Sequence, residues 1–245
     1  MRRFFIDKES ICGPTVHIKG GDYNHIKNVL RYKPEDTIYL IDSLGQRHTA
    51  SIKEITNHSL VCQIEKTERP ARAKGPIVTI AQAIPKGKKM DLIVQKATEL
   101  GAANIIPMTT ERTIVKLDGK EEKKLSHWQK IAKESSQQCG RDFIPSTEKI
   151  QSFDEVIAQA KEYDLSIIPW ECEENAGLKS LLQEGKPRSL FSVLFVIGPE
   201  GGFSVSEVEK ARQAGIMPVS LGKRILRTET VAMAVLAMLI YEYEL

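Results

Sequence analysis

The chain has 245 residues, of which 41% are hydrophobic, and its 35 Lys and Arg against 32 Asp and Glu give a net charge of +3. This composition is typical of a globular protein with one large or two modest domains, and it excludes disordered, collagen-like and coiled-coil chains. No apolar run reaches about 18 residues without a polar break, and charges directly follow the first apolar residues, so we expect neither a membrane span nor a secretory leader.

Residues 1–72 are predicted to form a small β-barrel. Alternating β-branched and aromatic residues predict three strands, and Ile26, Val29 and Leu30 at helical spacing predict a short helix over His25–Leu30. The predicted strands are Thr37–Asp42, Arg47–Ile55 and Ser59–Glu65. The stretch Glu68–Pro76 contains two prolines and a glycine and breaks both periodicities, so we place the domain boundary there.

Residues 73–245 alternate between strand and helix patterns, which predicts a parallel sheet covered by helices on both faces. The predicted strands are Ile77–Ile84, Asn104–Met108, Leu165–Trp170, Phe191–Ile197 and Met217–Leu221. The predicted helices are Asp91–Leu100, Lys120–Gln138, Phe153–Ala160, Leu178–Gln183 and Val231–Tyr243. Before the last strand, Ser204-x-x-Glu207 is a capping box that opens a further helix ending at Gly215.

Charge, cysteine and histidine usage narrow the function. Residues 1–74 carry 13 Lys and Arg against 9 Asp and Glu, and the remainder carries 22 against 23. This asymmetry is typical of a nucleic-acid-binding module beside a catalytic one, although a lysine-rich solvated surface gives the same count. The 4 cysteines are scattered without a C-x-x-C pair, which favours the reducing cytoplasm. The 5 histidines lack paired ligand spacing, so we expect no metal.

A glycine loop follows the predicted strand that ends at Ile197. It consists of Gly198, Pro199, Glu200, Gly201 and Gly202. Parallel α/β sheets bind ligands at the carboxyl ends of strands, and glycine lets backbone N–H groups approach a ligand closely. The loop is neither a P-loop nor a dinucleotide fingerprint, because no Lys-Ser/Thr follows it and no two glycines are spaced i, i+2. The alternative is a tight turn without a ligand.

A second glycine-marked loop, Leu221–Thr230, follows the next predicted strand and leads into the last helix. Thr228 or Thr230 is expected to cap that helix, and Arg227 supplies an always charged donor for a phosphate or carboxylate. For this segment taken alone, a basic surface loop without a ligand is an equally good interpretation. Two such loops at adjacent strand ends favour one shared pocket.

Basic residues outside these loops predict contacts to an RNA backbone. They are Arg2, Arg3, Arg31 and Lys33 in the first domain and Lys86 and Lys88 in the turn after Ile84. Solvated surface charges are the alternative.

Several motifs together resemble one known family. They are Arg2-Arg3-Phe4-Phe5, His25-Ile-x-Asn28-Val29-Leu30-Arg31, Pro85-Lys86-Gly87, Gln95–Gly101, Glu111-Arg112, Ile197–Phe203 and Leu221–Thr230. Over nearly the whole chain the pattern is similar to the RsmE type of small-subunit ribosomal RNA methyltransferase, of the SPOUT superfamily, which acts on N3 of a uridine. A departure is Val231, where many relatives carry alanine.

The resemblance implies an α/β fold in which a SPOUT-type parallel-sheet domain with a trefoil knot, residues 73–245, follows a smaller PUA-like RNA-binding β-barrel, residues 1–72. Knots are rare, so patterns of strands and helices would not predict this topology. The implied methyl donor is S-adenosylmethionine, and the implied partners are 16S ribosomal RNA or the small ribosomal subunit, and a second copy of the chain in a homodimer. Carried over onto this sequence, the cofactor-binding residues are Trp170, Glu171, Ile197, Gly198, Pro199, Gly201, Gly202, Leu221, Gly222, Ile225, Leu226 and Thr228.

The implied reaction is methylation of N3 of a specific uridine in 16S ribosomal RNA. N3 of uracil carries a proton at neutral pH, so the enzyme must align N3 with the methyl group and help the proton to leave. Glu200 is a candidate base, and Arg227 is a candidate stabiliser of the uracil anion or a phosphate clamp. Valine in place of Gly201 is expected to abolish cofactor binding. The alternatives are a SPOUT methyltransferase for another RNA nucleotide, a non-catalytic RNA-binding protein of ribosome assembly, and a nucleotide-dependent enzyme that uses these loops for phosphate.

Overall fold

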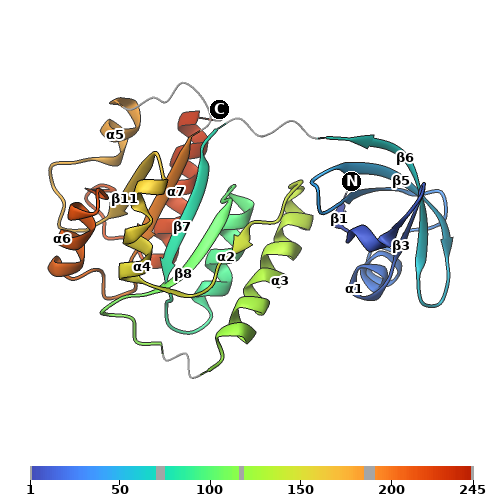
Figure 1. Cartoon of the computed structure of the whole chain (residues 1–245), viewed down its shortest axis with the longest axis horizontal. Coiled ribbons are helices and arrows are strands. Elements are labelled where there is room, and N and C mark those ends of the chain that lie inside the picture. The colour runs from blue at the N-terminus through green and yellow to red at the C-terminus, as the bar shows by residue number, and fades with distance from the viewer. Residues whose placement is uncertain (1, 70–74, 116–118, 185–190, 244–245) are drawn as a thin grey trace. The chain divides into compact units, whose positions relative to one another are not determined.

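The computed structural model describes residues 2–69, 75–115, 119–184 and 191–243. Its contacts divide the chain into two units. Unit 1 contains Met1–Arg72 and Ser136–Ile144, and unit 2 contains Ala73–Ser135 and Pro145–Leu245. Figure 1 shows that strands dominate unit 1 and that strands alternate with helices in unit 2.

Unit 1 is a curled sheet of 6 strands in the order β1–β4–β5–β6–β3–β2, and all pairs are antiparallel except β1 with β4. The strands are β1 (Arg3–Phe5), β2 (Ile11–Cys12), β3 (Thr15–Ile18), β4 (Thr37–Ile41), β5 (Arg47–Ile55) and β6 (Leu60–Glu68). The helical segments are η1 (Lys8–Ser10), α1 (Gly20–Asn24) and the π-helical turn η2 (His25–Val29). The predicted small β-domain is therefore confirmed, although β1, β2 and β3 were not predicted because they are too short to show a period.

The predicted helix over His25–Leu30 differs from what is found. The segment is a π-helical turn in which Leu30 N donates to His25 O at 2.9 Å. Ile26 is buried in the same hydrophobic core of unit 1 as Phe4 of β1. A π turn has a wider repeat than the 3.6 residues of an α-helix, so Val29, predicted to lie on the apolar face, is 66% exposed.

The segment Ser136–Ile144 groups with unit 1 through charged contacts. Asp142 Oδ1 pairs with Arg3 Nε at 3.0 Å, and Asp142 Oδ2 pairs with Arg47 Nη1 at 3.7 Å. Gln137 Nε2 also donates to Asp22 Oδ1 at 3.1 Å. One carboxylate between two arginines thus ties this segment to β1 and β5.

Unit 2 contains a sheet of 7 strands whose pairs are parallel, in the order β10–β8–β7–β12–β11–β13, with β9 beside β8. The strands are β7 (Ile77–Ala83), β8 (Asn104–Thr109), β9 (Ser146–Thr147), β10 (Gln151–Ser152), β11 (Leu165–Pro169), β12 (Ser192–Ile197) and β13 (Met217–Val219). The helical segments are α2 (Lys89–Glu99), α3 (Glu121–Cys139), α4 (Phe153–Ala158), η3 (Ala160–Glu162), α5 (Leu178–Glu184), α6 (Val205–Gln213) and α7 (Thr228–Tyr243).

The sheet of unit 2 is buried on both faces, which confirms the predicted layers. On one face, Leu194 and Val196 of β12 share a core with Phe153 of α4 and Val208 of α6. Successive side chains of a strand point to opposite faces, so Phe195 faces the other side, where α7 contacts β7, β12 and α2. This double burial explains why β12 reads as a continuous apolar run rather than as an alternating one.

Within the described residues, no helix is long and apolar enough to cross a membrane. The same residues contain no group of three or more His, Cys, Asp or Glu side chains that could hold a metal ion. The trefoil knot stays a prediction, because the order of the strands does not establish a threaded loop.

Candidate active site

Three loops of unit 2 converge where β11, β12 and β13 end. β11 pairs in parallel with both β12 and β13, so the carboxyl ends of the three strands lie side by side. The loops span residues 170–174 after β11, 198–204 after β12 and 220–227 after β13. This edge is where parallel sheets bind ligands.

The loops line two cavities that share a wall. We call the first the Leu221 cavity; its volume is about 560 Å³, and the loops after β11 and β13 form most of its lining. The second, the Gly198 cavity, has a volume of about 370 Å³ and is lined by parts of all three loops. The shared wall consists of Pro169, Glu171, Ile225, Leu226 and Val231. Cavities of this size suit small organic ligands.

The predicted cofactor-binding residues gather at these cavities, except Gly201. The Leu221 cavity alone is lined by Trp170, Leu221 and Gly222. The Gly198 cavity alone is lined by Ile197, Gly198, Pro199, Gly202 and Thr228. Both cavities are lined by Glu171, Ile225 and Leu226. Gly201 lines neither cavity. The two predicted catalytic residues, Glu200 and Arg227, both line the Gly198 cavity.

The glycine loop is a tight turn, and Gly202 is the residue in it whose backbone conformation and surroundings least tolerate a side chain. Gly202 N donates to Pro199 O at 3.0 Å, and Gly202 has a φ of +65°. A Cβ built on Gly202 would lie 2.5 Å from Glu171 Oε1 in the neighbouring loop. A Cβ on Gly201 would meet Arg112 Cβ at 3.4 Å, which is an ordinary contact. A side chain therefore disturbs the site at Gly202 far more than at Gly201.

A buried chain of hydrogen bonds joins the start of α7 to the glycine loop. Thr228 Oγ1 donates to Gly198 O at 2.6 Å and accepts from Gln82 Nε2 at 2.8 Å. Gln82 lies near the end of β7 and is 0% exposed. The prediction that Thr228 or Thr230 caps α7 is wrong, because α7 begins at Thr228 itself. The Thr228 hydroxyl instead holds the glycine loop against the helix.

Lys89, in the first turn of α2, lines the Gly198 cavity and pairs with Glu200. Lys89 Nζ lies 2.8 Å from Glu200 Oε1 and 3.8 Å from Glu229 Oε2, and Lys86 N donates to Glu200 Oε1 at 3.1 Å. Partial burial would raise the pKa of Glu200, but hydrogen bonds from Lys89 and from the backbone of Glu200 and Lys86 outweigh it and hold this pKa below 4.5. A carboxylate with a lowered pKa is a weak base at neutral pH.

Replacing Lys89 with methionine is expected to raise the pKa of Glu200, because burial is then no longer outweighed. The lowered pKa means that the stabilisation from ionised Glu200 is present at neutral pH and is lost as the pH falls below about 4.5. In Lys89→Met this stabilisation, and with it the loss of stability on acidification, should become smaller, because the folded-state pKa no longer lies as far below the unfolded value. Carbon-13 NMR titration of the carboxyl signals, assigned with Glu200→Gln, measures the shift. An unchanged pKa would show that the ion pair does not form in solution.

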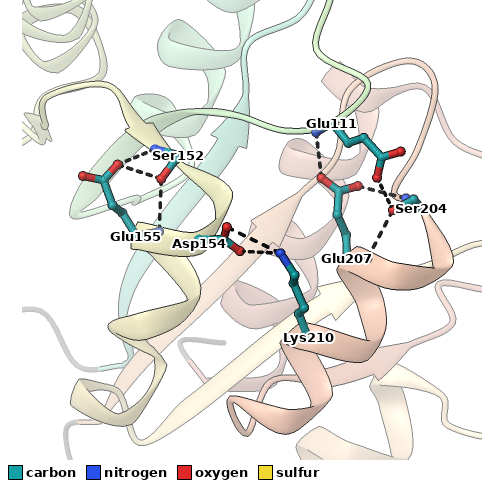
Figure 2. Close-up of polar contacts among 7 residues, drawn as sticks. All are labelled: Glu111, Ser152, Asp154, Glu155, Ser204, Glu207 and Lys210. Carbon is teal, nitrogen blue, oxygen red and sulfur yellow. Dashed lines mark hydrogen bonds and ion pairs between the residues drawn. The ribbon is translucent and has the colours of Figure 1, made fainter.

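A second network braces the glycine loop from the loop after β8 (Figure 2). Glu207, which is 5% exposed, accepts hydrogen bonds from Glu111 N at 2.8 Å and from Ser204 N at 2.9 Å. Ser204 Oγ donates to Glu111 Oε2 at 2.7 Å and accepts from Glu207 N at 3.2 Å, which confirms the predicted capping box. Arg112 Nη1 donates to Gly201 O at 2.7 Å. The Glu111-Arg112 motif thus holds the second half of the loop, at Gly201 and Ser204.

Glutamine in place of Glu207 is expected to destabilise the fold by about 1–3 kcal/mol, because one buried N–H loses its acceptor. Glu155→Gln is the matched control. Ser152 and Glu155 form the same capping box at the start of α4, but Glu155 is exposed (Figure 2). Urea unfolding compares the two variants with the wild type. Equal losses in both variants would show that the contact to Glu111 adds nothing beyond the cap.

The predicted RNA-binding residues lie in different surroundings. Arg3 is paired with Asp142 and its side chain is 20% exposed, so Arg3 supports unit 1 rather than presenting an unpaired charge. Arg2 is exposed and its Nη1 lies 2.6 Å from His25 Nε2. The other exposed members of the set are Arg31 and Lys33 in unit 1 and Lys86 and Lys88 in unit 2.

Three residues at the site were not predicted to act there. Lys89 stands in the lysine-rich turn whose other lysines are predicted to contact RNA, and nothing in the sequence separates it from them. Gln82 had a usable signal, because a polar side chain within an otherwise apolar strand marks a buried hydrogen bond. Arg112 belongs to a motif of the resemblance, but its contact with Gly201 arises only in the folded chain.

Comparison with known proteins agrees with this geometry. Residues 73–240 match the model of an RNA methyltransferase domain, and residues 18–65 match that of an RNA methyltransferase PUA domain. Ribosomal RNA small subunit methyltransferase E of Bacillus subtilis is 34% identical over 252 residues, which cover 100% of this chain and 98% of the relative.

Two solved structures are similar over almost their whole length. The crystal structure of ribosomal RNA small subunit methyltransferase E from Neisseria gonorrhoeae, bound to S-adenosylmethionine, has a TM-score of 0.86 and 31% identity, and the match covers 98% of this chain and 97% of that one. A Legionella pneumophila protein in complex with the same cofactor has a TM-score of 0.86 and 32% identity, with 98% and 96% covered. The chain belongs to the ribosomal RNA small subunit methyltransferase E family of RNA methyltransferases.

Proposed function

We propose that this chain transfers a methyl group from S-adenosylmethionine to N3 of a uridine in the ribosomal RNA of the small subunit. The observation that carries the proposal is the pair of joined cavities at the ends of β11, β12 and β13, in a chain that belongs to this family. The relative from Neisseria gonorrhoeae, crystallised with S-adenosylmethionine, supports the choice of cofactor.

The residues present fit this cofactor. Leu221, Ile225 and Leu226 offer apolar surface for the flat face of a purine, and the turn at Gly198–Gly202 offers backbone polar groups without intervening side chains. When bound, S-adenosylmethionine supplies a methyl group that its sulfonium centre has already activated. The protein therefore has to align the acceptor nitrogen and manage its proton.

We propose that Arg227 stabilises the negative charge that develops on the uracil ring. The Arg227 side chain is exposed in the Gly198 cavity and has no ion-pair or hydrogen-bond partner within the described part of the chain. A guanidinium held there stabilises the uracil anion that forms when N3 loses its proton. Glu200 stays ionised beside Lys89, so we assign Glu200 to orienting Lys89, a second cation of the same cavity, rather than to taking the proton.

We further propose that the exposed basic residues of both units contact the RNA backbone and that the enzyme works as a homodimer in the cytoplasm. Helix α7 supports the dimer, because it exposes Met238 by 40% and Tyr241 by 75% on a strongly apolar helix. Sedimentation equilibrium of the whole chain measures its mass in solution, and a monomer at micromolar concentration would contradict the dimer.

Transfer of labelled methyl groups tests the proposed reaction. Small subunits purified from a strain that lacks the enzyme, and the same RNA without proteins, are incubated with the chain and labelled S-adenosylmethionine. Nucleoside analysis is expected to show the label in 3-methyluridine. Label in another nucleoside would show a different target, and no label on either substrate would contradict the proposal.

A further inference from the structure

We propose that the Glu171 carboxylate recognises the positive charge of the sulfonium cofactor, so that the site binds the charged methyl donor more tightly than the neutral product. The inference rests on the proposed function and adds a residue that sets the selectivity of the site.

Two of the four carboxylates that line the cavities have ion-pair partners in the described part of the chain, and of the other two Glu174 lines the Leu221 cavity alone whereas Glu171 lines both. Glu200 is paired with Lys89 at 2.8 Å, and Glu173 is paired with Arg212 at 2.8 Å. Glu171 is exposed and has no hydrogen-bond or ion-pair partner among the residues that the structure describes. In the Gly198 cavity this leaves one unpaired anion, Glu171, and one unpaired cation, Arg227. A site with this pair of charges suits a positively charged donor beside an acceptor that becomes negative.

The position of Glu171 is set by the meeting of two loops. Glu171 belongs to the wall that both cavities share. Its Oε1 lies 2.5 Å from the point where a Cβ on Gly202 would be, so the carboxylate rests on the glycine turn. The absence of a side chain at Gly202 leaves the space that the carboxylate uses. A ligand with one arm in each cavity therefore passes Glu171 at its middle, and the sulfur of S-adenosylmethionine is the atom that joins its two arms.

The charge of the ligand changes during turnover. Methyl transfer converts the sulfonium into a thioether, which has no charge at sulfur, while the amino-acid part of the cofactor stays the same. A carboxylate at the sulfur therefore favours the donor over the product, S-adenosylhomocysteine. For an exposed pair of charges a few ångströms apart we expect a difference of about tenfold in affinity. A carboxylate that instead contacts the ammonium of the amino-acid part affects donor and product equally.

Calorimetry with three ligands tests the proposal. The ligands are S-adenosylmethionine, S-adenosylhomocysteine and sinefungin, which carries an ammonium where the donor has its sulfonium centre. The proteins are the wild type, Glu171→Gln and Glu209→Gln, in which an exposed carboxylate of α6 that lines neither cavity is neutralised. Glu171→Gln is expected to weaken the two charged ligands about tenfold and to change S-adenosylhomocysteine less than about twofold. Glu209→Gln is expected to match the wild type.

Equal weakening of all three ligands, or no weakening of any, would overturn the proposal. Salt gives a second measurement on the unmodified protein, because screening should lower the affinity for S-adenosylmethionine more than that for S-adenosylhomocysteine. Equal salt dependence of the two would also overturn it. A wild type that binds none of the three ligands would contradict the proposed function itself, which separates the two failures.

Discussion

Alanine in place of Gly202 is expected to weaken binding of S-adenosylmethionine about a hundredfold. Gly202 has a φ of +65°, and for alanine this left-handed conformation raises the free energy of the turn by roughly 1–2 kcal/mol. The added Cβ also displaces the Glu171 carboxylate, whose Oε1 lies 2.5 Å from the Cβ position. The turn therefore relaxes away from the shape that lines the Gly198 cavity, and binding has to restore it. Calorimetry of the variant measures the loss.

Gly201→Ala is the matched control for this substitution. Gly201 is the neighbouring glycine, it lines neither cavity, and its Cβ would meet Arg112 at an ordinary distance of 3.4 Å. We expect cofactor affinity within about threefold of the wild type. From the sequence, Gly201→Val is expected to abolish cofactor binding, whereas we propose from the positive φ of Gly202 that this neighbouring glycine is the sensitive one. Similar losses in the two variants would contradict the assignment to Gly202.

Alanine in place of Arg227 is expected to lower the rate of methyl transfer about 100- to 1,000-fold, which is the usual cost of removing one group that stabilises developing negative charge. Cofactor affinity should change little, because the proposed role of Arg227 is toward the uracil. Single-turnover transfer to small subunits measures the rate, and calorimetry with S-adenosylmethionine measures affinity. Arg227→Lys should recover part of the rate, since lysine keeps the charge but loses the planar guanidinium.

Arg224→Ala separates this role from a general effect of charge. Arg224 lies in the same loop, is exposed and lines the Leu221 cavity instead. Its removal changes the net charge by the same amount, so a purely electrostatic attraction of RNA would be weakened equally in both variants. We expect a much smaller loss of rate in Arg224→Ala. Equal losses would assign both arginines to RNA binding.

The parts of the fold that could be predicted have local causes. β12 is buried on both faces, so its residues from Val193 to Ile197 form a continuous apolar run that is visible in the sequence. Helix α6 begins at a capping box that is visible as Ser204 and Glu207. The grouping of Ser136–Ile144 with unit 1 was not predictable in this way, because the contacts of Asp142 join residues far apart in the chain.

The residues of the site likewise differ in whether they have a local signal in the sequence. Glycines directly after strands predict a backbone turn at the ligand-binding edge of a parallel sheet, so the loops at Gly198 and Gly222 could be predicted from the sequence alone. The loop at Trp170 and Glu171 carries no such signal, and only the resemblance to a family indicated it. The pairing of Lys89 with Glu200 depends on how α2 lies beside the glycine loop, and one lysine of a lysine-rich turn looks like another.

A crystal structure of this chain grown with S-adenosylmethionine tests the central claim most directly. We expect the cofactor to span the Leu221 and Gly198 cavities, with its sulfur beside Glu171 and its methyl group open toward Arg227. Cofactor bound at any other surface, with both cavities left to solvent, would contradict the account.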